Sequence, residues 1–449
     1  MLKYDAIIIG GGPAGNVTAL TARRYYPDKK ILLIRKVKRS IIPCAIPYIF
    51  GTLKSVDKIV TSDENLIKND IDLLIDEVIH IDREKKKIKT ASGKEYEYEK
   101  LVIATGAKPA VPPIEGVNLK GVYSIKKDAK YLEELLKAAE EANRVVIIGG
   151  GFVGVEIADD LNKAGKDVHI VEILPHLLYL NFDEEFCKLA ENRLNEIGVK
   201  FYMNTKVNKI VGKDKAEKVI LSNGEEIKTD IVILATGMVP NIELAKEAGI
   251  EIGKSGAIKV DEYLRTSDKN IFAVGDCAEK RMLFTGEPVR LMLASIATAE
   301  ARIAGANLFE LKVVNQIRGT IGIFSTNVRG LVLAAAGLIE RKAREEGFDA
   351  VVGYAKGIDR HPGILPGASE VITKCIVAKR GEVILGCEMA GGVSVAEMIN
   401  MMGVIIEEGV TVSKLINMQI GTHPLLTPSP PGSPIINAAV DALMKIRSG

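Results

Sequence analysis

Short apolar runs alternate with amphipathic stretches along the first two thirds of the chain, a pattern typical of parallel strands covered by helices. Buried strands are predicted at residues 4–9, 31–34, 101–104, 144–148, 167–171, 231–235 and 270–274, and helices at residues 16–26, 155–164 and 293–307. Residues 57–77 are interpreted as a helix followed by a strand, and residues 78–98 as a charged β-meander. This part of the chain is therefore expected to have an α/β fold.

The pattern changes after residue 313. Strand-like runs at residues 320–324, 351–358, 370–378 and 383–389 alternate with helical stretches at residues 340–346 and 393–408. This alternation predicts an antiparallel sheet with helices on one face.

Two glycine-rich motifs each stand between a predicted strand and a predicted helix. The first runs from Gly10 to Gly15 and the second from Gly149 to Gly154. In such a turn the first glycine permits the tight bend, the second lets the backbone approach a pyrophosphate, and the third lets the helix pack on the strand. The phosphate then lies at the helix N-terminus, where unpaired N–H groups favour negative charge. Two motifs indicate two bound dinucleotides, for which FAD first and a nicotinamide second is the usual pair.

The strand that follows each motif ends in a different kind of residue. Glu172 stands at the distance beyond Gly154 where a carboxylate accepts from a ribose 2′-hydroxyl and repels a 2′-phosphate, which favours NADH over NADPH. The nearby Lys166 and His176 keep NADPH open. The first strand ends in Arg35 instead of an acid, which leaves recognition of the FAD ribose without a sequence explanation.

Two further patterns extend the nucleotide-binding signature. The segments Ala104-Thr105-Gly106 and Ala235-Thr236-Gly237 each end a buried strand, so each nucleotide unit closes with one copy of an internal repeat. Gly275-Asp276 ends a later strand, and this aspartate is expected to accept hydrogen bonds from the ribityl hydroxyls of a flavin. The helix that begins at Leu293 is expected to direct its N-terminus at the flavin pyrimidine.

One cysteine lies between two prolines, shortly after the second strand. We interpret Cys44, flanked by Pro43 and Pro47, as the redox centre, because both glycine motifs and the Gly275-Asp276 segment surround it. The alternative is a small buried apolar residue. A reactive thiolate needs a lowered pKa, for which a helix N-terminus after Pro47 is the suggested cause.

The composition argues against several other classes. A formal net charge of +2 gives no electrostatic footprint for nucleic acid or a membrane surface. The five cysteines are odd in number, far apart and without CxxC spacing, so neither a disulfide framework nor a metal site is predicted, and a cytoplasmic location fits best. We expect neither a signal peptide nor a membrane span, which would need about 18 consecutive apolar residues.

Together these motifs resemble the FAD- and NAD(P)H-dependent pyridine nucleotide disulfide oxidoreductases, in particular their single-cysteine branch. The resemblance is carried by residues 10–15, 40–48, 104–109, 149–156, 235–240 and 275–278. The branch is indicated because dithiol reductases have a second cysteine where this chain has Arg39. The resemblance implies two Rossmann-like domains and a C-terminal α+β interface domain that forms a homodimer. The FAD-binding domain is then expected at residues 1–115 and 243–315, the NAD(P)-binding domain at 116–242 and the interface domain at 316–449.

The resemblance also implies which residues contact each cofactor. For FAD they are Gly10, Gly12, Pro13, Ala14, Gly15, Arg35, Ser40, Ala104, Thr105, Gly106, Gly275, Asp276, Leu293 and Ala294. For NAD(P) they are Gly149, Gly151, Phe152, Val153, Gly154, Glu156, Glu172 and Gly237. Phe152 stands where relatives place an aromatic gate over the flavin, and a core phenylalanine is the equal alternative.

Further residues concern the substrate. Coenzyme A disulfide reductases carry tyrosines in two C-terminal loops, but the matching loops here, 361–367 and 421–427, contain none. His423 is instead expected to act as acid and base for Cys44 across the dimer, with His361 a weaker candidate. Arg23, Arg24 and Lys36 are interpreted either as contacts for coenzyme A phosphates or as a solvated basic rim.

The predicted function is an FAD-dependent NAD(P)H oxidoreductase that reduces a sulfur species through Cys44. The substrate would be a coenzyme A disulfide, a coenzyme A persulfide or a polysulfide. An NADH oxidase or peroxidase that uses the sulfenic acid of Cys44 is the first alternative. A flavoprotein that passes electrons to a protein carrier such as rubredoxin is the second.

Overall fold

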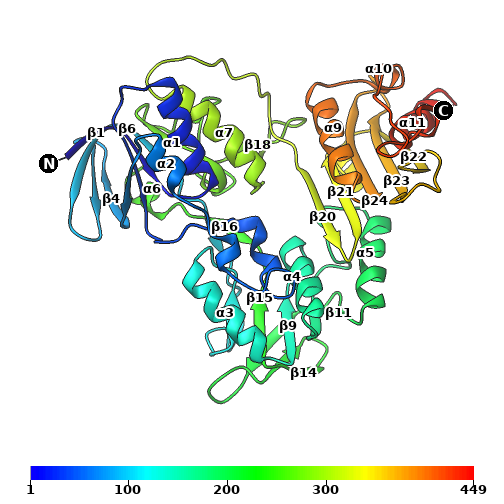
Figure 1. Cartoon of the computed structure of the whole chain (residues 1–449), viewed down its shortest axis with the longest axis horizontal. Coiled ribbons are helices and arrows are strands. Elements are labelled where there is room, and N and C mark those ends of the chain that lie inside the picture. The colour runs from blue at the N-terminus through cyan, green and yellow to red at the C-terminus, as the bar shows by residue number, and fades with distance from the viewer. Residues whose placement is uncertain (1, 449) are drawn as a thin grey trace.

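The computed structural model describes residues 2–448. Figure 1 shows three units in a triangular arrangement: a first unit that holds the blue N-terminal strands, a second unit below it in cyan and green, and a third unit that holds the orange and red C-terminal elements. Between Leu2 and Ser448 no helix is long and apolar enough to cross a membrane.

The first unit is built on a seven-stranded sheet in the order β3-β2-β1-β6-β5-β4, with β17 paired to β6. Its strands are β1 (Leu2–Ile9), β2 (Ile31–Arg35), β3 (Asp72–Ile75), β4 (Val78–Asp82), β5 (Lys87–Thr90), β6 (Glu95–Ile103) and β17 (Ile271–Ala273). Ile8 faces α1 (Pro13–Tyr25) and α7 (Ala294–Ala306), whereas Ile7 faces α6 (Glu243–Glu247) on the other side. Because β17 pairs with β6 in parallel, the chain returns to this sheet after building the second unit.

The second unit contains a parallel sheet in the order β11-β10-β9-β15-β8. Its strands are β8 (Val122–Ser124), β9 (Arg144–Ile148), β10 (Asp167–Val171), β11 (Lys200–Tyr202) and β15 (Ile231–Leu234). One face is covered by α3 (Ala129–Glu141), α4 (Phe152–Lys163) and α5 (Glu184–Glu196). The other face is covered by the small sheet of β12 (Val207–Val211), β13 (Lys218–Leu221) and β14 (Glu226–Lys228).

The two crossings between these units are paired with each other. Strand β7 (Ala107–Pro109) is antiparallel to β16 (Met238–Pro240). The Thr105 hydroxyl donates to the carbonyl oxygen of Asn241, and the Thr236 hydroxyl to that of Ala110, both at 2.7 Å. The repeated Ala-Thr-Gly motif therefore supplies matching hydrogen bonds that hold the two crossings side by side.

The third unit is an antiparallel sheet in the order β20-β21-β24-β23-β22. Its strands are β20 (Ile323–Val328), β21 (Leu331–Gly337), β22 (Ala350–Ile358), β23 (Glu370–Ala378) and β24 (Ile384–Gly391). Helix α9 (Val395–Glu407), which was predicted, and helix α11 (Pro434–Ser448), which was not, pack on one face. The other predicted helix, α8 (Glu340–Glu345), packs on the opposite face against Ile376 and Leu385, so the expectation of helices on one face alone is wrong. The opposite face contributes Val328, Leu333 and Ala335 to the core of the second unit, so these two units share one hydrophobic cluster.

Some local predictions differ from the structure. Helix α1 begins at Pro13 and α4 at Phe152, three residues earlier than predicted, because the preceding glycine already occupies the cap position and proline is well tolerated at the first helical position. Strand β20 lies at Ile323–Val328 rather than 320–324. Strand β21 was missed because its run of alanines carries little strand preference.

Candidate active site

Both glycine turns have the geometry that their motif predicts. Gly10 and Gly149 adopt positive φ angles of +119° and +109°. A Cβ atom on Gly10 would lie 2.1 Å from the carbonyl oxygen of Ala104, and one on Gly149 would lie 2.5 Å from that of Ala235. Only glycine fits at these two positions, because no other residue could avoid the strand behind the turn.

The turns are open where a pyrophosphate would approach. A Cβ atom on Gly12 or Gly151, the caps of α1 and α4, would meet nothing within 4 Å. By contrast, Gly15 and Gly154 lie against the carbonyl groups of the first glycines, with built Cβ atoms 1.9 Å and 2.0 Å from those oxygens. Each turn therefore combines close packing of its helix with free space at the helix N-terminus, which suits a bound phosphate.

Glu172 lies buried at the end of β10, beside the second turn. Its carboxylate accepts from the N–H groups of Gly150 at 2.5 Å and Leu174 at 2.8 Å. Each carboxylate oxygen can accept a second hydrogen bond, so capacity for a ribose hydroxyl remains. Glu172 thus both braces the glycine turn and presents negative charge where the second ribose is expected.

Arg35, the corresponding residue of the first unit, is also buried. Its guanidinium forms a bidentate ion pair with Asp63, with both N···O distances at 2.6 Å. It also donates to the carbonyl oxygens of Val37 and Lys38, each at 3.0 Å. The positive charge at this strand end is therefore already paired with a carboxylate.

Ser40 and the Gly275-Asp276 segment lie beside the first turn. The buried Ser40 hydroxyl donates to the carbonyl oxygen of Gly11 at 2.9 Å. A Cβ atom on Gly275 would lie 2.9 Å from the Cβ of Ala14, which shows how closely this segment approaches α1. Asp276 pairs with Lys127 at 3.1 Å and is half-buried. The structure thus brings the predicted FAD residues of three separate segments to one edge of the sheet.

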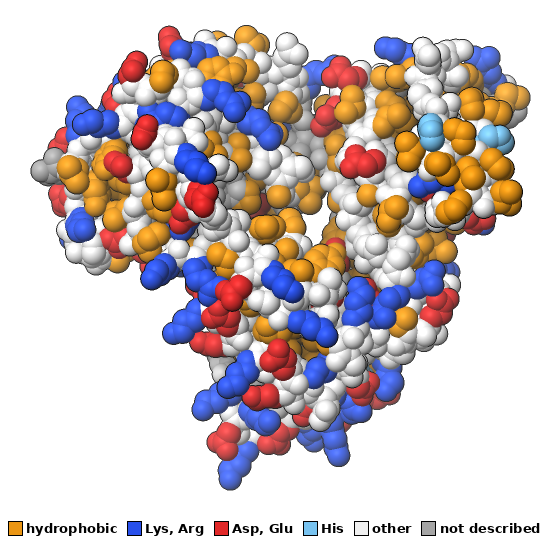
Figure 2. Space-filling model, viewed as in Figure 1, with side chains coloured by type: hydrophobic (Ala, Val, Ile, Leu, Met, Phe, Trp, Pro, Cys, Tyr) orange, Lys and Arg blue, Asp and Glu red, His pale blue; other side chains and the backbone are white. Residues whose placement is uncertain are grey.

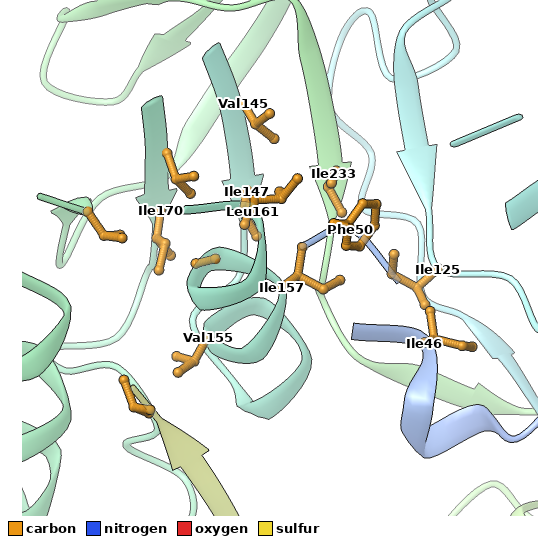
Figure 3. Packing of buried hydrophobic residues seen from close by; sticks show 14 of the residues in the cluster. Ile46, Phe50, Ile125, Val145, Ile147, Val155, Ile157, Leu161, Ile170 and Ile233 are labelled. Atoms are coloured by element: carbon orange, nitrogen blue, oxygen red, sulfur yellow. The ribbon is translucent and has the colours of Figure 1, made fainter. Parts of the chain in front are cut away.

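Cys44 lies on a short 3-10 helix, η1 (Pro43–Tyr48), and its side chain is exposed, whereas the other four cysteines are buried. Figure 3 shows the neighbours Ile46 and Phe50 beside Ile125 and Ile157 in the core of the second unit. The cysteine is therefore presented at the surface of a segment that is anchored by its apolar side chains.

A buried carboxylate holds the other end of this segment. Asp160 of α4, fully buried, accepts from the backbone N–H groups of Phe50 at 3.0 Å, Gly51 at 2.7 Å and Thr52 at 3.0 Å. The Thr52 hydroxyl also donates to it. Helix α4 of the second unit therefore fixes the cysteine segment of the first.

The pKa of Cys44 was predicted to be lowered. The protein's own groups raise it instead, so this prediction is wrong for the chain without its cofactors. Desolvation and the negative charge of Glu156 raise the pKa of Cys44, and Asp276 adds to the rise, whereas Lys127 and a backbone hydrogen bond at Cys44 act in the opposite direction. Pro47 lies inside η1 rather than before a helix, so no helix N-terminus follows it.

Glu156 lies where the second and third units meet near the cysteine. Burial raises the pKa of this carboxyl group to about 7. Its Oε1 accepts a hydrogen bond from the hydroxyl of Thr326, on β20, at 2.8 Å. A carboxyl group that titrates near neutrality and whose charge acts on the pKa of Cys44 can take up or release a proton within this site.

Phe152 belongs to a cluster of aromatic rings. Its ring centroid lies 5.0 Å from that of Phe324 and 6.1 Å from that of Phe182, both in edge-to-face geometry. Movement of the ring over a flavin would break both contacts, so the structure favours the core interpretation over the gate. The next residue, Val153, is exposed on the first turn of α4.

His361 and His423 lie on adjacent loops of the third unit. The N–H of His361 donates to the carbonyl oxygen of Pro424 at 3.1 Å, and the N–H of Leu425 donates to Nδ1 of His423 at 3.3 Å. Both histidines are exposed. The loops thus support each other, and the action of His423 on Cys44 across a dimer stays a prediction.

The basic residues predicted to contact coenzyme A have different surroundings. The guanidinium of Arg23 donates to the carbonyl oxygens of four residues, Pro27, Lys29, Asn69 and Asp70. These bonds use four of the five N–H donors of the guanidinium, which favours a structural role for Arg23, and its contact with a coenzyme A phosphate stays a prediction. Lys36 lies 3.5 Å from Glu77, and Arg24 is exposed at the end of α1.

Four contacts at the site were not predicted: those of Asp63, Lys127, Asp160 and Thr326. For Asp160 the signal was available, since two consecutive aspartates stand in the middle of a helix that follows a glycine motif. Asp63 and Thr326 meet their partners only through the fold. A cavity of ≈ 640 Å³ between α7 and residues 315–321 contains none of the predicted site residues, so the site is defined by the strand ends and not by this cavity.

Comparison with known proteins adds the decisive observation. Residues 4–301 match the family described as pyridine nucleotide-disulphide oxidoreductase, and residues 323–432 match its dimerisation domain. The chain belongs to this family. Members of this oxidoreductase family bind FAD and NAD(P)H, and the two open glycine turns fit both pyrophosphates. The α/β fold and the presence of a dimerisation domain are thus confirmed.

Relatives within the family differ in their named acceptors. The chain is 37% identical to the NADH oxidase of Methanocaldococcus jannaschii, over 98% of this chain and 99% of that protein. It is 35% identical to the NAD(P)H coenzyme A polysulfide/persulfide reductase of Pyrococcus horikoshii, over 87% and 88%. A NAD-dependent persulfide reductase from A. fulgidus has the same fold, with a TM-score of 0.93 and 34% identity, covering 99% of this chain and 84% of that one.

Proposed function

We propose that this oxidoreductase takes electrons from NAD(P)H and reduces a sulfur species at Cys44. The observation that carries the proposal is the placement of Cys44, the one exposed thiol among five, on a segment held by the nicotinamide-unit helix α4. FAD, when bound, supplies the route by which two electrons pass from the nicotinamide to the sulfur. The net reaction consumes NAD(P)H, a proton and a disulfide or persulfide, and yields NAD(P)⁺ with two thiols or with a thiol and hydrogen sulfide.

The chain's own groups provide three things for this reaction. The turns at Gly12 and Gly151 bind the pyrophosphates of the two dinucleotides. The anchored segment around Cys44 positions the reacting sulfur. Glu156, whose pKa of about 7 suits proton exchange at neutral pH, holds a proton near that sulfur. His423 of the partner subunit is proposed to protonate the departing thiolate.

The nicotinamide is proposed to be NADH. Glu172 is buried and braced by two backbone N–H groups, so its carboxylate cannot swing away from a 2′-phosphate. Repulsion between this carboxylate and the phosphate of NADPH is the physical basis of the preference.

The acceptor is proposed to be a coenzyme A persulfide, a coenzyme A disulfide or a polysulfide. Relatives named for coenzyme A and sulfur, at 35% and 34% identity, support this choice. An NADH oxidase that cycles Cys44 through its sulfenic acid is the second candidate, and the relative from Methanocaldococcus jannaschii favours it. Transfer to a protein carrier such as rubredoxin, which would not need Cys44, is the third.

The proposed assembly is a cytoplasmic homodimer. Residues 323–432 match a dimerisation domain, and Figure 2 shows apolar side chains gathered over the outer face of the third unit. Exposed residues of that unit include Ile364 (91%), Leu426 (66%) and Met444 (62%). Burial of such side chains at a subunit interface would remove them from water.

The test is the rate of anaerobic NADH oxidation with each sulfur acceptor, compared with the aerobic rate without one. Fast anaerobic turnover that is lost in Cys44→Ser and kept in the buried control Cys375→Ala is expected. Repeating the assay with NADPH measures the nicotinamide preference. Turnover with oxygen or peroxide alone would refute the sulfur reductase and favour the oxidase. Full activity of Cys44→Ser toward an oxidised protein carrier such as rubredoxin would refute both cysteine mechanisms.

A further inference from the structure

The first nucleotide site lacks the acidic residue that normally ends its second strand, and Arg35 stands there instead. We propose that Asp63, held in place by Arg35, is the carboxylate that accepts hydrogen bonds from the adenosine ribose of FAD. The inference deepens the proposed function, since it rests on FAD occupying the first site. Asp63, which comes from another part of the chain, thus takes the place of the acid that the strand lacks.

The position of Arg35 shows where its partner lies. A Cβ atom on Gly11 would lie 2.5 Å from Cδ of Arg35, so the arginine side chain runs directly beside the first glycine turn. Its guanidinium then reaches Asp63 through two hydrogen bonds at 2.6 Å. The carboxylate is thereby placed at the edge of the sheet where the carboxyl ends of parallel strands meet and where nucleotides bind in this type of fold.

The second unit offers an internal comparison. There the residue next to the turn is Glu172, and a Cβ atom on Gly150 would lie 3.2 Å from its Oε2. Gly11 and Gly150 hold the same place in the two motifs, and so do Arg35 and Glu172 at the strand ends. In the second unit the strand end supplies the carboxylate itself. In the first unit it supplies Arg35, which binds the carboxylate of Asp63.

Asp63 has the capacity for this task. It stands at the N-cap position of α2 (Glu64–Lys68), yet its side chain makes no capping hydrogen bond. Its side chain is 30% exposed, whereas that of Arg35 is 2% exposed, so the carboxylate is the accessible end of the pair. Each oxygen accepts one N–H from Arg35 and retains a second acceptor position for a ribose hydroxyl. The bidentate pairing also fixes the orientation of both oxygens.

The experiment measures FAD affinity on the full-length protein after removal of bound flavin, by quenching of flavin fluorescence. The probes are FAD and two analogues whose adenosine carries 2′-deoxyribose or 3′-deoxyribose. The unmodified protein is expected to bind at least one analogue about tenfold more weakly than FAD, because a hydrogen bond to a charged acceptor is lost. Asp63→Ala is expected to bind FAD about tenfold more weakly and to lose the discrimination between FAD and the analogue.

Controls separate this role from a structural one. Asp57→Ala removes a nearby exposed carboxylate that pairs with Arg39, and it should keep the discrimination. Arg35→Met should lose the discrimination between FAD and the analogue, because Arg35 no longer orients the carboxylate of Asp63. Asp63→Asn, which keeps the shape but loses the charge and the bidentate pairing with Arg35, serves if the alanine variant does not fold. Unchanged discrimination in either Asp63 variant, or its absence in the unmodified protein, would overturn the proposal. Because no electron acceptor is present, failure here would leave the proposed reaction untouched.

Discussion

Replacing Asp160 by alanine tests whether helix α4 holds the redox cysteine in place. The carboxylate is fully buried and accepts from three consecutive backbone N–H groups and one hydroxyl, all within residues 50–52. A hydrogen bond to a charged acceptor contributes about 1.5–3 kcal/mol when buried. Because Thr52 is exposed and water can replace part of the loss, we take about 1 kcal/mol for each of the three N–H groups.

The local free energy of opening should therefore fall by about 3 kcal/mol, which corresponds to about a hundredfold faster amide exchange at residues 50–52. Alkylation of Cys44 by iodoacetamide should also proceed at more than one rate, because the segment that holds Cys44 then adopts more than one arrangement. The matched control is Asp159→Ala. Asp159 is the adjacent buried acid on the same helix, but it pairs with Arg329 and Lys163 instead. Exchange at residues 50–52 that is unchanged in Asp160→Ala, or equally fast in the control, would refute the reasoning.

Two further predictions concern charge. Because the negative charge of Glu156 raises the pKa of Cys44, Glu156→Gln should speed alkylation of Cys44 at pH 8 and remove the inflection near pH 7, the pKa of Glu156, from the pH–rate profile; identical profiles would contradict this. Lys374→Met should lower the melting temperature at pH 8, because the buried carboxylate of Asp183 loses its cation at a cost of about 3–5 kcal/mol. The loss should shrink at about pH 4, the ordinary pKa of an aspartate, because Asp183 without its cation can then take up a proton; an equal loss at both pH values would argue against the mechanism.

The glycine motifs show what local sequence can predict. The turns at Gly10 and Gly149 need glycine for reasons that act within a few residues, so pattern and spacing were sufficient to place both nucleotide sites. The repeat around Thr105 and Thr236 was also visible in the sequence, although its purpose, the paired crossings, appeared only in the fold.

Charged residues were harder to interpret. In the sequence, Arg23 and Arg35 were both predicted to contact a ligand, Arg23 a coenzyme A phosphate and Arg35 the FAD. In the structure Arg23 binds backbone carbonyl groups, whereas Arg35 binds Asp63. The partner of a long side chain depends on segments that are distant along the chain, so the pattern of basic residues could not separate the two roles.

The sequence by itself determined the two nucleotide-binding units, the class of cofactors and the choice of Cys44 as the candidate redox residue. Each of these depends on short-range chemistry: a glycine where the backbone must turn, an apolar run where a strand is buried, a thiol between two prolines. Only the tertiary structure decided what surrounds Cys44. Glu156 and Thr326 are 170 residues apart, and Asp160 is 108 residues from Thr52. Such contacts form because packing of the three units brings distant segments together. The pattern of residues within one segment does not indicate which other segment it will contact.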